Sequence, residues 1–276
     1  MIGPTKRIAI VTAASSGLGL AAARGLDAAG WTLVLMSRSQ KIEQVADELG
    51  ATAIRGDITD PAALKRLVQL ALDLHGRIDG AMINTGHAAK GELLEIPDED
   101  WHSALDIVLM PTVRLCRLLV PIFSAQGGGA IVSMSSFAAE QPDLVYPLSS
   151  AFRASLTSFM KLCVDRHANQ GLRINAVLPG FMDNYPTLEA NARKVPTGRY
   201  GKVQELGETI AFLLSDSAGY KWAINPCRRR IGQSNLRPQA SRRSRNTRHI
   251  CYVAPQPILA APMAYRIVRR CNSWRD

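Results

Sequence analysis

The segment RIAIVTAASSGLG, residues 7–19, decides the fold. Residues 7–11 carry a run of apolar side chains that predicts a buried strand. The turn that follows contains Thr12, Ser15, Ser16, Gly17, Leu18 and Gly19. Small residues allow a tight turn, and a helix that begins there directs its amide groups and positive dipole end toward a phosphate. We predict a strand–turn–helix unit that binds a pyrophosphate, although ordinary tight turns use the same residues.

The chain continues as an alternation of strand and helix patterns. Strands are expected at residues 7–11, 32–36, 51–54, 80–83, 130–134 and 172–178. Helices are expected at residues 17–29, 39–50, from 60 onward, 101–123, 147–168 and 203–215, with Pro111 bending or loosening one turn. Ser39 and Asp60 are expected to cap the starts of the second and third helices, Gly50 to close the second, and Leu74 to lie on the apolar face of the third. This alternation is typical of a doubly wound, Rossmann-like parallel sheet in a three-layer α/β/α domain. We predict a single domain over residues 1–220.

Composition excludes several classes of protein. We find no uninterrupted apolar run of the roughly 18 to 20 residues that cross a bilayer, and no signal-peptide pattern at the start. We therefore expect a cytoplasmic protein that does not bind membranes. The five cysteines have no CxxC spacing, so neither a metal site nor a disulfide framework is expected. His87 and His102 are isolated in the sequence and receive no role.

Further motifs follow the turn in a familiar order. They are Asp57-Ile58, Asn84-Thr85-Gly86, the stretch GLRINAVLPG at residues 171–180, and the loop and helix at residues 196–216. With the turn at residues 12–19, they resemble the short-chain dehydrogenase/reductase family over residues 5–220. The resemblance implies a nicotinamide dinucleotide cofactor. It also implies that Asp57 and Ile58 contact the adenine, and that Asn84, Thr85, Gly86, Pro179 and Gly180 belong to the cofactor site.

The end of the second predicted strand bears on the choice of cofactor. An acidic residue there would bind the adenosine 2′-hydroxyl and repel a 2′-phosphate. This chain has Ser37-Arg38 instead, and a guanidinium is suited to bidentate phosphate contact. We predict NADP(H), with NADPH preferred over NADH. The alternative is that Arg38 is a solvated arginine at a strand exit.

The family's catalytic Asn-Ser-Tyr-Lys group is altered in this chain. Counting back without gaps from Asn175 and Pro179 places Val108 at the Asn position, Ser136 at the Ser position, Ser149 at the Tyr position and Arg153 at the Lys position. The resemblance implies that Ser136 holds the substrate oxygen and that Arg153 binds the nicotinamide ribose. A serine hydroxyl such as that of Ser149 has no pKa near the value of about 10 for tyrosine, so it is a poor proton donor.

Tyr146 is the candidate that could restore the proton transfer. It lies three residues before Ser149 and seven before Arg153, so the three side chains could share one helical face. Pro147 marks the start of the helix, so Tyr146 need not follow ideal helical geometry. The alternative is that Tyr146 only packs under the substrate loop. A different alignment would place Tyr146 at the Tyr position and Ser150 at the Lys position, but it needs two compensating gaps.

The last 56 residues differ in charge from the rest of the chain. Residues 1–220 carry 20 Lys and Arg against 22 Asp and Glu, whereas residues 221–276 carry 13 against 1. Codons that encode residues 221–231 can, when read one base later, give NGQSTRVDGGL, which resembles the family's last strand. We interpret residues 221–276 as a frameshifted, disordered tail that cannot form a seventh strand. The alternative is a basic arm that binds nucleic acid or a membrane surface.

The sequence thus predicts an oxidoreductase that transfers a hydride between NADP(H) and a small carbonyl or alcohol substrate. Because three catalytic positions are altered, a cofactor-binding protein without turnover, either a sensor or an inactive subunit, is the alternative. A nucleic-acid binder that acts through the tail is a third possibility, which we set aside because the tail carries no motif. We expect a homo-oligomer, a dimer or tetramer, when the family's natural C-terminus is present.

Overall fold

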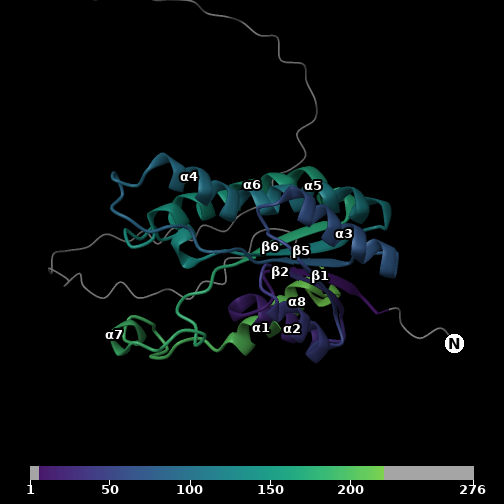
Figure 1. The fold of residues 1–276 in the computed structure, drawn as a ribbon, viewed down its shortest axis with the longest axis horizontal. Helices are drawn as coiled ribbons and strands as arrows, with labels where there is room; N and C mark the ends of the chain where they lie inside the picture. The colour runs from purple at the N-terminus through teal and green to yellow at the C-terminus, as the bar shows by residue number, and fades with distance from the viewer. Residues whose placement is uncertain (1–5, 221–276) are drawn as a thin grey trace, which may run out of the picture. The chain divides into compact units, whose positions relative to one another are not determined.

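The computed structural model describes residues 6–220, and these residues form one six-stranded parallel sheet (Figure 1). The strands are β1 (Ile8–Thr12), β2 (Thr32–Ser37), β3 (Thr52–Arg55), β4 (Gly80–Ile83), β5 (Gly129–Met134) and β6 (Leu172–Val177). Their order is β3-β2-β1-β4-β5-β6, which confirms the predicted doubly wound topology. The order reverses between β1 and β4, and ligands bind outside the carboxyl ends of the strands at such a switch point.

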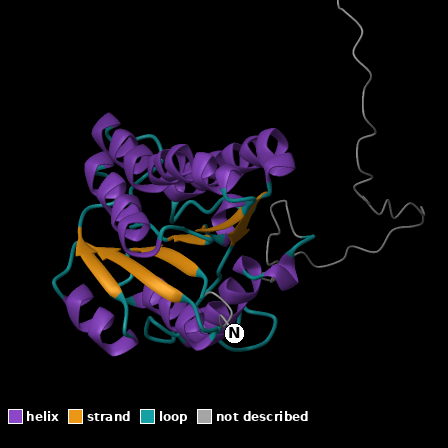
Figure 2. Cartoon of the chain, turned by 90° about the vertical axis from the view of Figure 1, so that its right-hand side faces the viewer, coloured by secondary structure: helices purple, strands orange, loops and turns teal. Residues whose placement is uncertain are grey.

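Helices cover both faces of the sheet, so the domain has three layers (Figures 1 and 2). One face carries α1 (Gly17–Ala28), α2 (Lys41–Leu49) and α8 (Val203–Leu214). The other carries α3 (Pro61–His75), α5 (Met110–Ala125) and α6 (Pro147–His167). The short helices α4 (Asp98–Ala104) and α7 (Glu189–Ala192) lie in the connections after β4 and β6. Each face of the sheet has its own apolar core, because parallel strands are buried on both sides.

Most predicted helix ends are confirmed, with two local corrections. Asp60 caps α3 by accepting a hydrogen bond of 2.8 Å from the Ala62 amide. Ser39 is not the residue that immediately precedes α2; Gln40 takes that position, although the Ser39 hydroxyl still accepts from the Lys41 amide. Leu74 was expected on the buried face of α3 but is 52 % exposed, because it lies in the last turn, beyond the edge of the core.

Pro111 loosens its helix, as predicted. The five residues Leu105–Leu109 form a π-helical turn between α4 and α5. The turn ends one residue before the proline, which has no amide hydrogen to donate. The whole stretch Asp98–Ala125 is long and apolar enough to cross a membrane by length and composition. Of its apolar side chains, Leu115, Leu119 and Phe123 are buried against the sheet.

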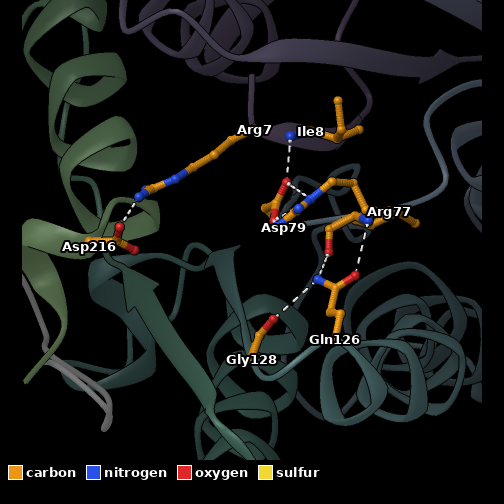
Figure 3. A network of polar contacts seen from close by, with 8 residues as sticks. Arg7, Ile8, Arg77, Asp79, Gln126, Gly128 and Asp216 are labelled. Atoms are coloured by element: carbon orange, nitrogen blue, oxygen red, sulfur yellow. Dashed lines mark hydrogen bonds and ion pairs between the residues drawn. The ribbon is translucent and has the colours of Figure 1, made fainter. Parts of the chain in front are cut away.

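A polar network ties the loops together at the amino ends of the strands (Figure 3). Asp79 accepts a hydrogen bond of 2.9 Å from the Ile8 amide, which fixes the start of β1 beside the start of β4. The Gln126 amide group donates to the carbonyl oxygens of Ile78 and Gly128. These contacts hold the amino ends of the strands together. Because ligands of this fold bind outside the carboxyl ends of the strands, a binding site is expected at the opposite ends.

Candidate functional site

The carboxyl ends of β1 and β4 are joined by reciprocal hydrogen bonds. The Thr12 hydroxyl donates to the Asn84 carbonyl at 2.7 Å and accepts from the Asn84 amide at 3.0 Å. The Asn84 side chain also donates to the Ala13 carbonyl at 3.4 Å. These bonds fix the turn after β1 to the switch point. Thr85 and Gly86 continue the chain from there, and the Thr85 side chain is buried.

The turn after β1 is strained and closely packed. Ala13, which stands where the family has its first glycine, has a φ of +49°, in the left-handed region that favours glycine. A Cβ atom on Gly19 would lie 2.1 Å from the Ala13 carbonyl oxygen and 2.8 Å from the Asn84 side-chain nitrogen. Gly17 has a φ of +54° and opens α1, immediately after Ser16. The backbone at Ala13 therefore lies closer to Gly19, in the first turn of α1, than a side chain at position 19 would allow.

The predicted adenosine end lies beside this turn. The Ser15 and Ser37 hydroxyls, both buried, are 2.8 Å apart and connect the turn to the end of β2. The exposed Arg38 guanidinium lies 3.6 Å from a carboxylate oxygen of Asp57. Partial burial alone would raise the pKa of Asp57, but hydrogen bonds from Thr59 and the charge of Arg38 outweigh it and lower the pKa below its ordinary value. Asp57 is therefore ionised at neutral pH, and the adjacent Ile58 is buried.

Ser136 lies just past the end of β5. Its hydroxyl accepts a hydrogen bond of 3.3 Å from the Ala138 amide, which leaves its own hydrogen available to another acceptor. The Phe137 amide donates to the Pro179 carbonyl at 3.3 Å, so the segments after β5 and β6 are held side by side. Gly180 follows Pro179 and is exposed. Val108, at the family's Asn position, is fully buried in the π-helical turn and offers no polar group.

Arg153 is a buried cation in α6. Its guanidinium donates to the Met134 carbonyl at 2.7 Å and to the Ser149 hydroxyl at 3.1 Å, and both acceptors are neutral. Burial lowers the pKa of Arg153 to about 10, so the group stays positive at neutral pH. The structure brings Arg153 and Ser149 together as their four-residue spacing predicted. It also places a cation directly beside the end of β5, where Ser136 lies.

Tyr146 precedes α6 and is not part of it. Its backbone angles are not helical, and Pro147 begins the helix, so exact helical spacing does not apply to its side chain. Lys90, from the segment after β4, lies over the Tyr146 ring with its Nζ atom 4.7 Å from the ring centroid. Ser150 is buried and its hydroxyl donates to the Tyr146 carbonyl at 2.8 Å, so it serves the helix start. The gap-free alignment is thus the one that puts a cation at the Lys position.

His87 takes part in the same region, although its isolation in the sequence suggested no role. Its Nε2 atom lies 3.0 Å from the Tyr185 hydroxyl, in the segment after β6. Desolvation by neighbouring groups and the positive charges of Arg153 and Lys90 lower the pKa of His87, so its ring is neutral at neutral pH. The position of His87 immediately after Gly86, at the switch point, is the sequence signal that could have indicated this.

These residues fit a nicotinamide dinucleotide. Among residues 6–220, the Ser135 hydroxyl and the Asn184 side-chain oxygen are buried without a hydrogen-bond partner. Ser135 directly precedes Ser136, and the Asn184 side chain lies 3.6 Å from where a Cβ atom on Gly17 would be. Buried polar atoms of this kind are ordinarily paired. Asn184 borders the turn after β1, and Ser135 borders the end of β5. A phosphate at the first place and a ribose at the second would find hydrogen-bonding groups there. No cluster of His, Cys, Asp and Glu suited to a metal occurs among the described residues.

Comparison with known proteins agrees with this geometry. Residues 12–222 match the family model described as enoyl-(acyl carrier protein) reductase. The chain is 31 % identical over 240 residues to the oxidoreductase UcpA of Salmonella typhimurium, covering 78 % of this chain and 90 % of that protein. It is 30 % identical over 224 residues to the 3-oxoacyl-acyl-carrier-protein reductase FabG of Escherichia coli, covering 78 % and 92 %. The chain therefore belongs to the short-chain dehydrogenase/reductase family of nicotinamide-dependent oxidoreductases.

Proposed function

We propose that this protein transfers a hydride between NADP(H) and a small carbonyl or alcohol substrate. The observation that carries the proposal is the buried cation Arg153, which lies near Ser136 at the end of β5. Within residues 6–220, the acceptors of its hydrogen bonds are a hydroxyl and a carbonyl, both neutral. The cofactor supplies or accepts the hydride when bound. Ser136 donates a hydrogen bond to the substrate oxygen. Arg153 binds the ribose hydroxyls and stabilises the negative charge that develops on the substrate oxygen. Ser149 orients the Arg153 guanidinium. Oxidation of NADPH by a panel of ketones, followed at 340 nm, tests the proposal.

Tyr146 is the proposed acid/base. Its phenol gives a proton to the substrate oxygen during reduction and takes it back during oxidation. Tyr146→Phe removes only the hydroxyl, so we expect turnover to fall by about 100-fold or more while the NADPH dissociation constant stays unchanged. Steady-state kinetics and a fluorescence titration of NADPH measure the two quantities.

Two variants control the Tyr146 experiment. Tyr185→Phe removes the phenol hydroxyl beside His87, and Ser149→Ala removes the hydroxyl at the family's Tyr position. A large loss in either control, with full activity in Tyr146→Phe, would move the acid/base away from Tyr146. If the parent protein binds NADPH but turns over no ketone, the alternative function, a cofactor-binding sensor or inactive subunit, is favoured instead.

Arg38 is the proposed binding group for the 2′-phosphate. We expect Arg38→Asp to weaken NADPH binding by roughly tenfold to 100-fold, because a charge-assisted hydrogen bond is replaced by repulsion, and to make NADH the tighter ligand. Titration of both cofactors measures the change. Arg24→Asp is the matched control, since Arg24 is an exposed arginine on α1, paired with Glu48, and makes the same change in charge. Equal affinities of the parent for NADPH and NADH would contradict the assignment.

We propose further that the catalytic domain ends near residue 220 and that residues 221–276 are the product of a frameshift. The family match that ends at residue 222 supports this division. The predicted disorder and the missing seventh strand fall outside the described residues. Members of the family are typically oligomeric, which supports a homo-oligomer once the natural C-terminus is present. We also propose that the protein is cytoplasmic. A coding sequence whose uninterrupted frame is shared by relatives through Asp276 would refute the frameshift.

A further inference from the structure

Exposed apolar side chains gather on the three segments that follow β4, β5 and β6. Of the ten exposed large hydrophobic residues within residues 6–220, six lie on these segments: Leu93, Leu94, Leu144, Val145, Tyr185 and Leu188. Scattered exposed hydrophobic residues are ordinary, but a concentration of them on adjoining segments indicates a binding surface.

Two of the segments carry these residues at the tips of tight turns. Leu93 and Leu94 occupy the central positions of a turn closed by a hydrogen bond of 2.9 Å from the Glu95 amide to the Glu92 carbonyl. Leu144 and Val145 occupy the same positions in a turn closed at 2.9 Å from the Tyr146 amide to the Asp143 carbonyl. Central turn positions favour Gly, Pro, Asn, Asp and Ser. Turn formation therefore does not explain the apolar pairs, and Leu94 is 93 % and Leu144 78 % exposed.

Contacts between side chains join the three segments around the proposed active site. Lys90, three residues before Leu93, lies over the Tyr146 ring, which adjoins Val145. His87, in the segment after β4, contacts the hydroxyl of Tyr185, which belongs to the segment after β6. The two turns and the segment after β6 therefore adjoin the same region. Arg153 is close enough to this region for its positive charge to lower the pKa of His87.

Charged side chains on two of these segments are engaged within the protein. Asp143 accepts a hydrogen bond of 2.8 Å from the Val145 amide, and Asp183 accepts one of 2.9 Å from the Val203 amide. Glu189 forms an ion pair with Arg193. These carboxylates stabilise the loops. In the segment after β4 the exposed Glu92 and Glu95 flank the leucine pair, and the apolar side chains at the two turn tips are the groups that can bury against an apolar ligand.

We infer that the substrate carries an extended apolar chain next to its carbonyl group, and that the two leucine-bearing turns, Glu92–Glu95 and Asp143–Tyr146, cover this chain. The inference rests on the proposed function, because it identifies the apolar chain as part of that reaction's substrate. Covering the turns with a ligand removes the Leu94 and Leu144 side chains from water, which is the source of affinity.

Binding of a homologous series of 2-alkanones, from 2-butanone to 2-decanone, tests the inference. The full-length protein is saturated with NADP⁺, so no turnover occurs, and affinity is measured by calorimetry. We expect the affinity to rise about threefold for each added methylene, because each one becomes largely buried. Leu94→Asn and Leu144→Asn are expected to flatten this dependence, whereas Leu74→Asn, a change at an exposed leucine on α3, leaves it intact.

Each result decides the inference separately from the proposed function. Affinity that is independent of chain length, no binding of the longest ketone, or an equal loss in Leu74→Asn overturns the inference, even where NADPH-dependent turnover is found. A steep dependence that Leu94→Asn and Leu144→Asn remove supports it, even where hydride transfer fails. If these two variants change only the molecular mass in sedimentation and not ketone affinity, the turns form an interface between copies of the chain and the inference fails.

Discussion

Replacing Arg153 with methionine is expected to lower turnover by about 100-fold or more while the domain stays folded. The loss follows from the removal of a preorganised positive charge beside the proposed position of the reacting oxygen, a contribution of this order in other enzymes. The proposed hydrogen bonds to the ribose disappear with the guanidinium, so we also expect the NADPH dissociation constant to rise about tenfold.

The expected stability follows from two opposing contributions. Lowering the pKa of Arg153 to about 10 corresponds to a destabilisation of roughly 3 kcal/mol, because the unfolded chain holds the proton more tightly. This destabilisation is complete below pH 10 and disappears as the pH rises further, so methionine relieves all of it at neutral pH. Against this, the Met134 carbonyl and the Ser149 hydroxyl lose a donor, at about 1 to 3 kcal/mol each. The two contributions partly cancel, so urea denaturation should give a free energy of unfolding between about 1 kcal/mol above and about 3 kcal/mol below the parent's.

Arg173→Met provides the opposite pattern as a control. The Arg173 guanidinium donates to four carbonyl oxygens at and just beyond the end of α8, those of Leu213, Leu214, Ser215 and Ala218. Its loss is expected to lower stability by about 2 kcal/mol or more and to leave the turnover of the folded enzyme unchanged. If Arg153→Met instead strongly destabilises the domain while the protein that remains folded keeps normal turnover, Arg153 is a structural cation and the proposed role is wrong. Arg153→Lys, which keeps a charge, should retain activity within about tenfold.

The sequence was sufficient for the sheet because each buried strand is a short apolar run between turn residues. All six predicted strands lie within one residue of the observed bounds, from RIAIV to LRINAVL. The helix caps at Asp60 and Gly50 were predictable for the same reason, since their chemistry is local. The π-helical turn was predictable in kind from Pro111, whose effect on a helix depends only on its missing amide hydrogen.

The parts of the site that the sequence did not predict depend on contacts between distant residues. His87 and Tyr185 are separated by 98 positions, and nothing local to either residue indicates that they meet. The contact of Lys90 with the Tyr146 ring likewise depends on how two loops pack after the strands are assembled. Leu74 fits the helical pattern of α3 and is still exposed, because the pattern does not report where the neighbouring core ends. Tertiary packing decides each of these cases.

Gly19→Ala is expected to abolish useful cofactor binding, weakening NADPH affinity by about 100-fold or more, which corresponds to roughly 3 kcal/mol of binding free energy. The added Cβ atom would lie 2.1 Å from the Ala13 carbonyl oxygen, a backbone atom that can move only if the whole turn moves. It would also lie 2.8 Å from the Asn84 side-chain nitrogen and so displace the hydrogen bond to Ala13. We expect the free energy of unfolding to fall by about 3 kcal/mol as well, because the clash adds strain to a turn that already holds Ala13 at a positive φ.

Gly30→Ala separates the effect on the cofactor site from a general cost of replacing glycine. Gly30 has a φ of +81°, and no heavy atom lies within 4 Å of the position of its added Cβ atom. The substitution should therefore cost only the left-handed penalty of about 1 kcal/mol and leave NADPH affinity unchanged. Fluorescence titration of NADPH and urea denaturation of both variants measure the difference. A Gly19→Ala protein that bound NADPH as tightly as the parent would mean that the cofactor does not lie against the turn after β1, and the placement of the whole site would have to be abandoned.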